Sequence, residues 1–187
     1  MHASYEIVQV MQKKGYIQIY TGDGKGKTTA SLGLAMRALG HGWKVLIIQF
    51  TKNSRNDMDY GELVSSQLFP NLDIIQFGTD KVVYSNTISE EDKLQAKKGW
   101  LVAKEAITAN KYNMIIMDEL NVAMSLGLVD ESDVVSTILS KPEEMEIVLT
   151  GRYAPASVIS IAHLVTSMKP IKHYFDVGIP AREGIEY

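Results

Sequence analysis

The sequence predicts an α/β fold, built on a mostly parallel sheet with helices on both faces. Two features of the chain carry this prediction. Short apolar runs alternate with longer segments of helical character, which is the order typical of strand–helix–strand units. A glycine-rich turn and an acidic pair each follow directly on such a run, where parallel sheets commonly hold their ligands.

Three strands and one helix are predicted in the first 80 residues. Tyr16–Tyr20 has the β-branched and aromatic residues of a strand, and Lys27–Leu39 is a helix rich in Ala, Leu and Met. Val45–Ile48 is a short apolar run typical of a buried parallel strand. A polar loop follows at Asn53–Gly61, and a further strand around Ile74–Phe77.

The rest of the chain continues the alternation. Ser89–Asn110 is the longest predicted helix, and its first residues resemble a capping box. After it we predict the strand Met114–Met117, a helix over Asp130–Leu139 and the strand Ile147–Leu149. The last elements are a helix over Pro155–Ala162 and a strand at Leu164–Val165.

Length and composition fit one globular domain. The 187 residues match a single domain over residues 1–187, and 45% hydrophobic with 22% charged residues is ordinary for such a protein. The 19 basic and 22 acidic residues give a net charge of −3, so the basic excess of a nucleic-acid-binding protein is missing. The predicted partners therefore include no nucleic acid.

The sequence contains no cysteine, which excludes disulfides, thiolate-bound zinc and iron–sulfur clusters. No apolar run approaches the roughly 18 residues of a membrane span, and Met1–Lys14 lacks the apolar core of a signal peptide. We therefore expect a cytoplasmic protein without a membrane partner.

The turn after the first strand has the composition of a phosphate-binding loop. It reads Thr21-Gly-Asp-Gly-Lys-Gly-Lys-Thr-Thr29 and leads from a strand into a helix. The glycines let the backbone wrap tightly and turn its amides inward, and Lys27 adds a full charge for the phosphates. The usual pattern has a glycine six positions before the lysine, where this chain has Thr21, so the loop is a shortened variant. The alternative is an ordinary glycine turn beside a lysine, but the strand and helix on either side favour the P-loop NTPase-like fold.

The acidic pair Asp118-Glu119 directly follows the apolar run Met114–Met117, as in a Walker B motif. Carboxylates at this edge of the sheet, together with the Thr28 hydroxyl, are the oxygen ligands that Mg²⁺ prefers. The alternative is that Asp118 caps a helix starting near Asn121. His41, His163 and His173 have no evident partners, and we interpret them as packed or surface residues.

Several separated motifs of the chain resemble those of the P-loop ATP:corrinoid adenosyltransferases, also called cob(I)alamin adenosyltransferases. They occur in the family's order over about residues 16–187: Thr21–Ala30, Arg37–Gly42, Gln49–Phe50, Asp118–Leu120, Thr150–Arg152, Pro155, Lys169–Gly178 and Gly184–Tyr187. The resemblance implies transfer of the 5′-deoxyadenosyl group of ATP to cobalt(I) of a reduced corrinoid, with triphosphate as the leaving group. This fits a chain with no evident side-chain nucleophile, because the cobalt attacks.

The resemblance also implies a set of site residues. Lys27, Thr28 and Glu119 would act in catalysis, and Mg²⁺ or Mn²⁺ would be bound by Thr28 and Glu119, with Asp118 as the second choice. Substrate binding is predicted for Gly22, Asp23, Gly24, Lys25, Gly26, Lys27, Thr28, Thr29, Arg37 and Tyr84. A homodimer and a flavoprotein reductant are the partners that the resemblance implies.

One segment departs from the family pattern. After the third strand the family carries Gly-Thr-Gly-Phe-Thr-Trp, whose aromatic rings press on the corrinoid and help to remove its lower axial ligand. This chain reads Phe77-Gly-Thr-Asp-Lys-Val-Val-Tyr84, without that Phe and Trp. Either Tyr84, or Val82 and Val83, replaces them, or the corrinoid site has changed.

Two other functions are compatible with the same loop and acids. The first is a P-loop small-molecule kinase or ATPase, which would release ADP. The second is a nucleotide- or corrinoid-binding protein without catalysis, for which the altered segment after Phe77 is the support.

Overall fold

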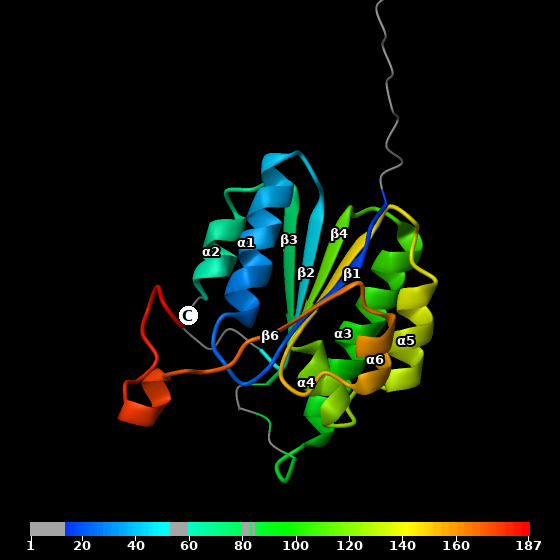
Figure 1. Cartoon of the computed structure of the whole chain (residues 1–187). Coiled ribbons are helices and arrows are strands. Elements are labelled where there is room, and N and C mark those ends of the chain that lie inside the picture. Colours follow the sequence, from blue (N-terminus) through cyan, green and yellow to red (C-terminus); the bar gives the residue numbers. More distant parts are fainter. Residues whose placement is uncertain (1–13, 53–59, 80–82, 84) are drawn as a thin grey trace, which may run out of the picture.

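Six parallel strands form the centre of the molecule, in the order β3-β2-β4-β5-β1-β6 (Figure 1). The computed structural model describes residues 14–52, 60–79, 83 and 85–187. Every strand pairing in this sheet is parallel, as predicted. The strands are β1 (Ile17–Thr21), β2 (Val45–Phe50), β3 (Leu72–Phe77), β4 (Met114–Asp118), β5 (Glu146–Thr150) and β6 (Leu164–Ser167).

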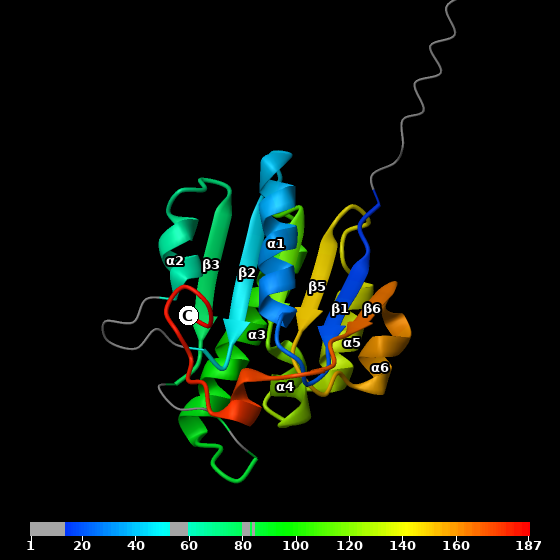
Figure 2. The same ribbon diagram turned by 60° about the vertical axis from the view of Figure 1, so that its left-hand side comes forward.

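Helices cover both faces of the sheet, which confirms the predicted α/β fold (Figures 1 and 2). One face carries α1 (Lys27–Gly40) and α2 (Gly61–Ser66). The other face carries α3 (Glu90–Ala109), α4 (Leu120–Ser125), α5 (Glu131–Leu139) and α6 (Ala156–Ile161). Within the described ranges, no helix is long and apolar enough to cross a membrane.

The two faces of the sheet have separate apolar cores. Strands β2, β4 and β5 are buried along their whole length, which explains why their sequences are continuous apolar runs rather than alternating ones. Because successive side chains point to opposite faces, Ile47 packs in the core beneath α1, whereas Ile48 packs in the core beneath α3.

Most predicted elements agree with the structure to within a few residues. The capping box of α3 is present, since the Ser89 side chain accepts the amide of Asp92, and the Asp92 carboxylate accepts the amide of Ser89. Helix α2 and the short 3₁₀ helix η1 (Tyr174–Val177) were not predicted. Both span less than two turns, and neither contains a buried residue that would give an apolar period.

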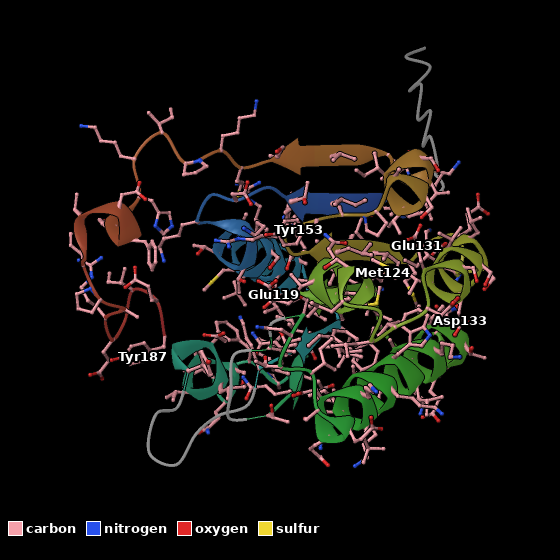
Figure 3. The ribbon with its side chains drawn as sticks, turned by 90° about the horizontal axis from the view of Figure 1, so that it is seen from below. Glu119, Met124, Glu131, Asp133, Tyr153 and Tyr187 are labelled. Carbon is pink, nitrogen blue, oxygen red and sulfur yellow. The ribbon has the colours of Figure 1, made fainter. Side chains whose placement is uncertain are left out.

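The chain after β6 runs along the carboxyl-end edge of the sheet. It passes the turn between β1 and α1, forms η1 and ends close to α2 (Figures 2 and 3). This course brings the last residues to the edge where a parallel α/β sheet holds its ligand.

Candidate active site

The glycine-rich turn between β1 and α1 is shaped by the segment that follows β6. Gly22 and Gly26 have φ angles of 92° and 119°, which L side chains rarely adopt. A Cβ atom on Gly22 would lie 2.5 Å from the carbonyl oxygen of Met168. The amide of Gly24 donates to this same oxygen at 2.8 Å, so the prediction that the loop amides turn inward is wrong for Gly24.

Lys27 begins α1 and extends its side chain back across the turn. Its Nζ donates to the carbonyl oxygens of Gly22 and Gly24, both at 2.8 Å, and the residue is 8% exposed. Burial lowers the pKa of Lys27, whereas the nearby Glu119 carboxylate opposes this shift. The Lys27 ammonium thus lies at the centre of the loop.

Asp118, at the end of β4, is fully buried and accepts four hydrogen bonds. Oδ1 accepts from the hydroxyls of Thr28 at 2.8 Å and Thr150 at 2.6 Å. Oδ2 accepts from Lys52 Nζ at 2.8 Å and Gln49 Nε2 at 3.3 Å. Burial alone would raise the pKa of Asp118, but Lys52 and the two hydroxyls outweigh it and the pKa is lowered. The carboxylate is therefore ionised.

Helix α4 follows directly but does not use Asp118 as its cap. Its N-cap residue is Glu119, and no side-chain capping hydrogen bond is present there. The alternative in which Asp118 caps this helix is therefore wrong, because its carboxylate points to Thr28 instead.

Glu119 lies in a strained and partly desolvated position at this edge (Figure 3). Its φ angle of 62° is left-handed, and its amide donates to the Thr150 hydroxyl at 3.0 Å. Burial raises the pKa of Glu119, and the Asp118 charge adds to this effect. Lys52, Lys27 and Arg152 act in the opposite direction but do not cancel the rise.

A cavity of about 630 Å³ opens in front of the phosphate loop, between α1, α2 and the chain's last residues. This volume suits a small-molecule ligand. Helix α1 contributes to both the polar end and the apolar part of this cavity. The polar end includes Lys25, Lys27, Thr28, Lys52, Glu62 and Glu119; the apolar part includes Leu32, Ala35, Met36, Leu39, Phe69, Leu72 and Ile74.

The C-terminal residues line this cavity and contact the phosphate loop. Lys25 Nζ donates to the carbonyl oxygen of Ile185 at 3.1 Å and lies 3.3 Å from the Glu186 carboxylate. That carboxylate also accepts the amide of Arg182 at 2.9 Å, and the Arg182 guanidinium lies 4.7 Å from the centre of the Tyr174 ring. These contacts tie the last turn of the chain to the loop.

The structure brings most of the predicted site residues together. Lys25, Gly26, Lys27, Thr28, Thr29 and Glu119 line the cavity, and Asp118 lies behind Thr28. Arg37 is separate: it is exposed in the last turn of α1, about 15 Å along the helix from Lys27, and acts electrostatically on Tyr20. Tyr84 and Val82 lie outside the described residues.

Several polar residues of the site were not predicted from the sequence, among them Lys52, Thr150 and Arg152. Lys52 and Thr150 bind Asp118, and Arg152 Nη2 donates to the carbonyl oxygen of Asp23 in the loop at 3.2 Å. The motif Thr150–Arg152 was a signal for two of them, because it follows β5 at the same edge of the sheet. Lys52 had no comparable signal.

Two of the three histidines, His163 and His173, have structural partners, as expected for packed or surface residues. Nδ1 of His163 accepts the amide of Ile17 at 3.1 Å, and Nδ1 of His173 accepts the amide of Phe175 at 3.1 Å. In the part of the chain that the structure describes, no group of three or more His, Cys, Asp or Glu side chains forms a metal site.

Comparison with known proteins identifies the family. The family model for ATP:corrinoid adenosyltransferase BtuR/CobO/CobP matches residues 13–187. A corrinoid adenosyltransferase of Sinorhizobium sp is 35% identical over 178 residues, which are 94% of this chain and 81% of that protein. The corrinoid adenosyltransferase of Escherichia coli (strain K12) is 31% identical over 181 residues, 97% of this chain and 90% of that protein.

An uncharacterised protein of Nostoc sp., all2391, is 38% identical over 169 residues, which are 85% of this chain. This chain spans 45% of the length of that protein. The match of the family model over nearly the whole chain agrees with the phosphate loop and the buried aspartate described above. The chain belongs to the ATP:corrinoid adenosyltransferase family BtuR/CobO/CobP.

Proposed function

We propose that the protein transfers the 5′-deoxyadenosyl group of ATP to cobalt(I) of a reduced corrinoid and releases triphosphate. Membership of the family supports this activity. The observation that carries the proposal is the combination of Lys27 across the loop and Thr28 bonded to Asp118, at the polar end of one cavity. Such a site can bind ATP and can stabilise the negative charge that grows on a triphosphate leaving group.

The reaction balances without a protein nucleophile. The electron pair of cobalt(I) forms the bond to C5′ of ATP, and the C5′–O5′ bond breaks with its pair retained by the triphosphate. Negative charge therefore grows on the leaving group in the transition state, where fixed cations lower the barrier most. Lys25 and Lys27 would supply such cations from the loop, and the protein's task is to align the two substrates.

The residues at the polar end fit a divalent cation. The Thr28 hydroxyl donates a hydrogen bond to Asp118, which leaves the lone pairs of the Thr28 oxygen free to bind a metal ion. Glu119 presents a carboxylate to the cavity, whereas both oxygens of Asp118 are already engaged. Thr28 and Glu119 would therefore hold Mg²⁺ or Mn²⁺ together with phosphate oxygens, and Asp118 would orient Thr28. The ion would neutralise part of the triphosphate charge.

A product analysis tests this proposal. The protein is mixed anaerobically in dim light with ATP, Mg²⁺ and chemically reduced cob(I)alamin, and the corrinoid spectrum and the phosphate product are followed. Adenosylcobalamin and triphosphate in equal amounts are expected. ADP without a carbon–cobalt bond would indicate a kinase or ATPase instead, and bound ATP without turnover would indicate a binding protein.

Three further parts complete the proposal: the assembly and the reductant rest on the family resemblance, and the location rests on the sequence alone. We include a homodimeric assembly, a flavoprotein that reduces the corrinoid and a cytoplasmic location. The molar mass in solution tests the assembly, and a reductase that replaces the chemical reductant in the product analysis tests the partner.

A further inference from the structure

Lys52 occupies an unusual place in the site. It follows β2, whereas the phosphate loop follows β1, and strands β4 and β5 lie between them in the sheet. Its ammonium nevertheless reaches the buried Asp118 carboxylate at 2.8 Å and lines the same cavity as Lys27 and Thr28. Lys52 and the Thr28 hydroxyl therefore bind the two oxygens of the same Asp118 carboxylate, Lys52 at Oδ2 and Thr28 at Oδ1.

A purely structural role would be to neutralise Asp118. That role does not account for the exposure of Lys52, since 19% of its side chain remains open while the Asp118 side chain is sealed at 0%. Asp118 also accepts three neutral hydrogen bonds, from Thr28, Thr150 and Gln49, which already stabilise its charge. The ammonium has three N–H donors, so it can bind Asp118 and an anion in the cavity together.

The surroundings hold Lys52 in a fixed direction. Asp118 anchors its nitrogen, and the Tyr60 ring lies 5.7 Å from it. Burial lowers the pKa of Lys52, but Asp118, with smaller contributions from Glu62 and Glu119, outweighs it, and the pKa is raised. A preorganised cation of this kind binds an anion without the entropic cost of ordering a free side chain.

We propose that Lys52 is a second triphosphate-binding lysine, presented to the cavity by Asp118 from the end of β2. The inference rests on the proposed function and adds a residue to it. A triphosphate would then be bound from two sides, by the loop lysines after β1 and by Lys52 after β2.

The test measures binding of inorganic triphosphate by calorimetry in EDTA, so that no metal ion contributes. Lys52→Met is expected to weaken binding at least about tenfold, because a charge-assisted hydrogen bond is lost. Lys52→Arg retains the charge and is expected to keep most of the affinity. Lys104→Met removes an equal charge from α3, on the far face of the sheet, and is expected to bind like the wild type.

Lys52→Met leaves the buried Asp118 charge without its cation, which can impair folding. A second comparison avoids this problem, between Asp118→Asn and the double variant Asp118→Asn/Lys52→Met, neither of which buries an unpaired carboxylate at this position. At least tenfold weaker binding by the double variant supports the proposal. Equal affinities would overturn it and leave Lys52 only as the counter-ion of Asp118.

Lys27→Met separates this inference from the proposed function. If Lys27→Met abolishes triphosphate binding while the two Asp118→Asn proteins bind equally, only the role of Lys52 is rejected. If Lys27→Met binds triphosphate normally, the loop is not the phosphate site, and both the proposed function and the inference fail.

Discussion

Glu119 combines a strained backbone with a charge in a partly desolvated position. Its left-handed conformation is of a kind that costs about 1–3 kcal/mol. Burial and the neighbouring Asp118 both oppose its ionisation. A bound cation would relieve the electrostatic part of this cost, so the ligand-free protein is less stable than its packing would allow.

Glu119→Gln is therefore expected to raise the free energy of unfolding of the ligand-free protein. A carboxyl whose pKa is raised by folding contributes stability at low pH, and this contribution is lost as the pH rises through the raised value. Gln cannot ionise and has no such loss, so its stability gain over Glu should be larger at pH 8 than at pH 4, which lies below the ordinary glutamate pKa of 4.5. Urea denaturation at both pH values measures it, and an equal gain at the two would contradict the explanation.

Gly151, beside Glu119, has little room for a side chain. Its φ angle is 123°, and a Cβ atom would lie 3.1 Å from Glu119 Oε2, Asn121 Cβ and the amide of Val122. Gly151→Ala is expected to destabilise the fold by about 1–3 kcal/mol and to reduce activity by moving Glu119.

Gly33 provides the matched control for Gly151. It lies within α1, and a Cβ atom there would meet nothing within 4 Å. Gly33→Ala is expected to stabilise the protein by about 0.5–1 kcal/mol, because alanine is the better helix former. Thermal unfolding measures the stability of both variants. Similar changes in stability would contradict the explanation that close contacts leave little room for a side chain at Gly151.

Among the secondary-structure elements, α3 has the most complete N-terminal cap. Ser89→Ala removes the side-chain acceptor of the Asp92 amide and is expected to cost about 1 kcal/mol of stability. Ser136→Ala in α5 is the control: its hydroxyl binds the carbonyl oxygen of Asp133 within the helix and is exposed, so its loss should change stability little. Chemical denaturation measures the free energy of unfolding of both variants, and equal losses of stability would argue against the capping role of Ser89.

The elements that the sequence predicted are those whose signals are local. The buried strands are continuous apolar runs, and the phosphate loop and the acidic pair are contiguous residues at strand ends. Helix α2 has no buried residue, so it lacks the apolar pattern that would predict it. Arg37 was expected in the site from its family position, but it lies one helix length away from the loop.

The missing parts of the site depend on contacts between distant positions in the chain. Lys52 and Asp118 are 66 residues apart, and Lys25 and Ile185 are 160 residues apart. Neither pair has a spacing that a local pattern could reveal, because strand order and the course of the last residues create both contacts. The segment around Tyr84 lies outside the described residues, so the replacement of the family's aromatic pair stays a prediction.

For the molecule as a whole, nucleotide binding should appear as increased stability. A ligand at a hundredfold excess over its Kd adds about 2.7 kcal/mol when it binds only the folded state. ATP with Mg²⁺ is therefore expected to raise the Tm, and EDTA to reduce this increase.

In the Lys27→Ala variant, both the increase in Tm with ATP and the activity should be largely lost, because Lys27 extends across the loop. The variant is expected to fold normally. Normal turnover by this variant would show that the nucleotide binds elsewhere.

The position of β1 in the sheet also affects how the protein is made. Among the described residues, β1 pairs with β5 and β6 only, and its residue Ile17 aligns with Ile147, 130 positions later. At a synthesis rate of about 5–20 residues per second, a ribosome needs roughly 7 to 26 s to produce that partner. During this time β2 can already pair with β3 and β4, whereas β1, which leads into the phosphate loop, has no partner strand to pair with. Nascent chains released before β5 is complete would therefore contain half of the sheet but could not hold ATP.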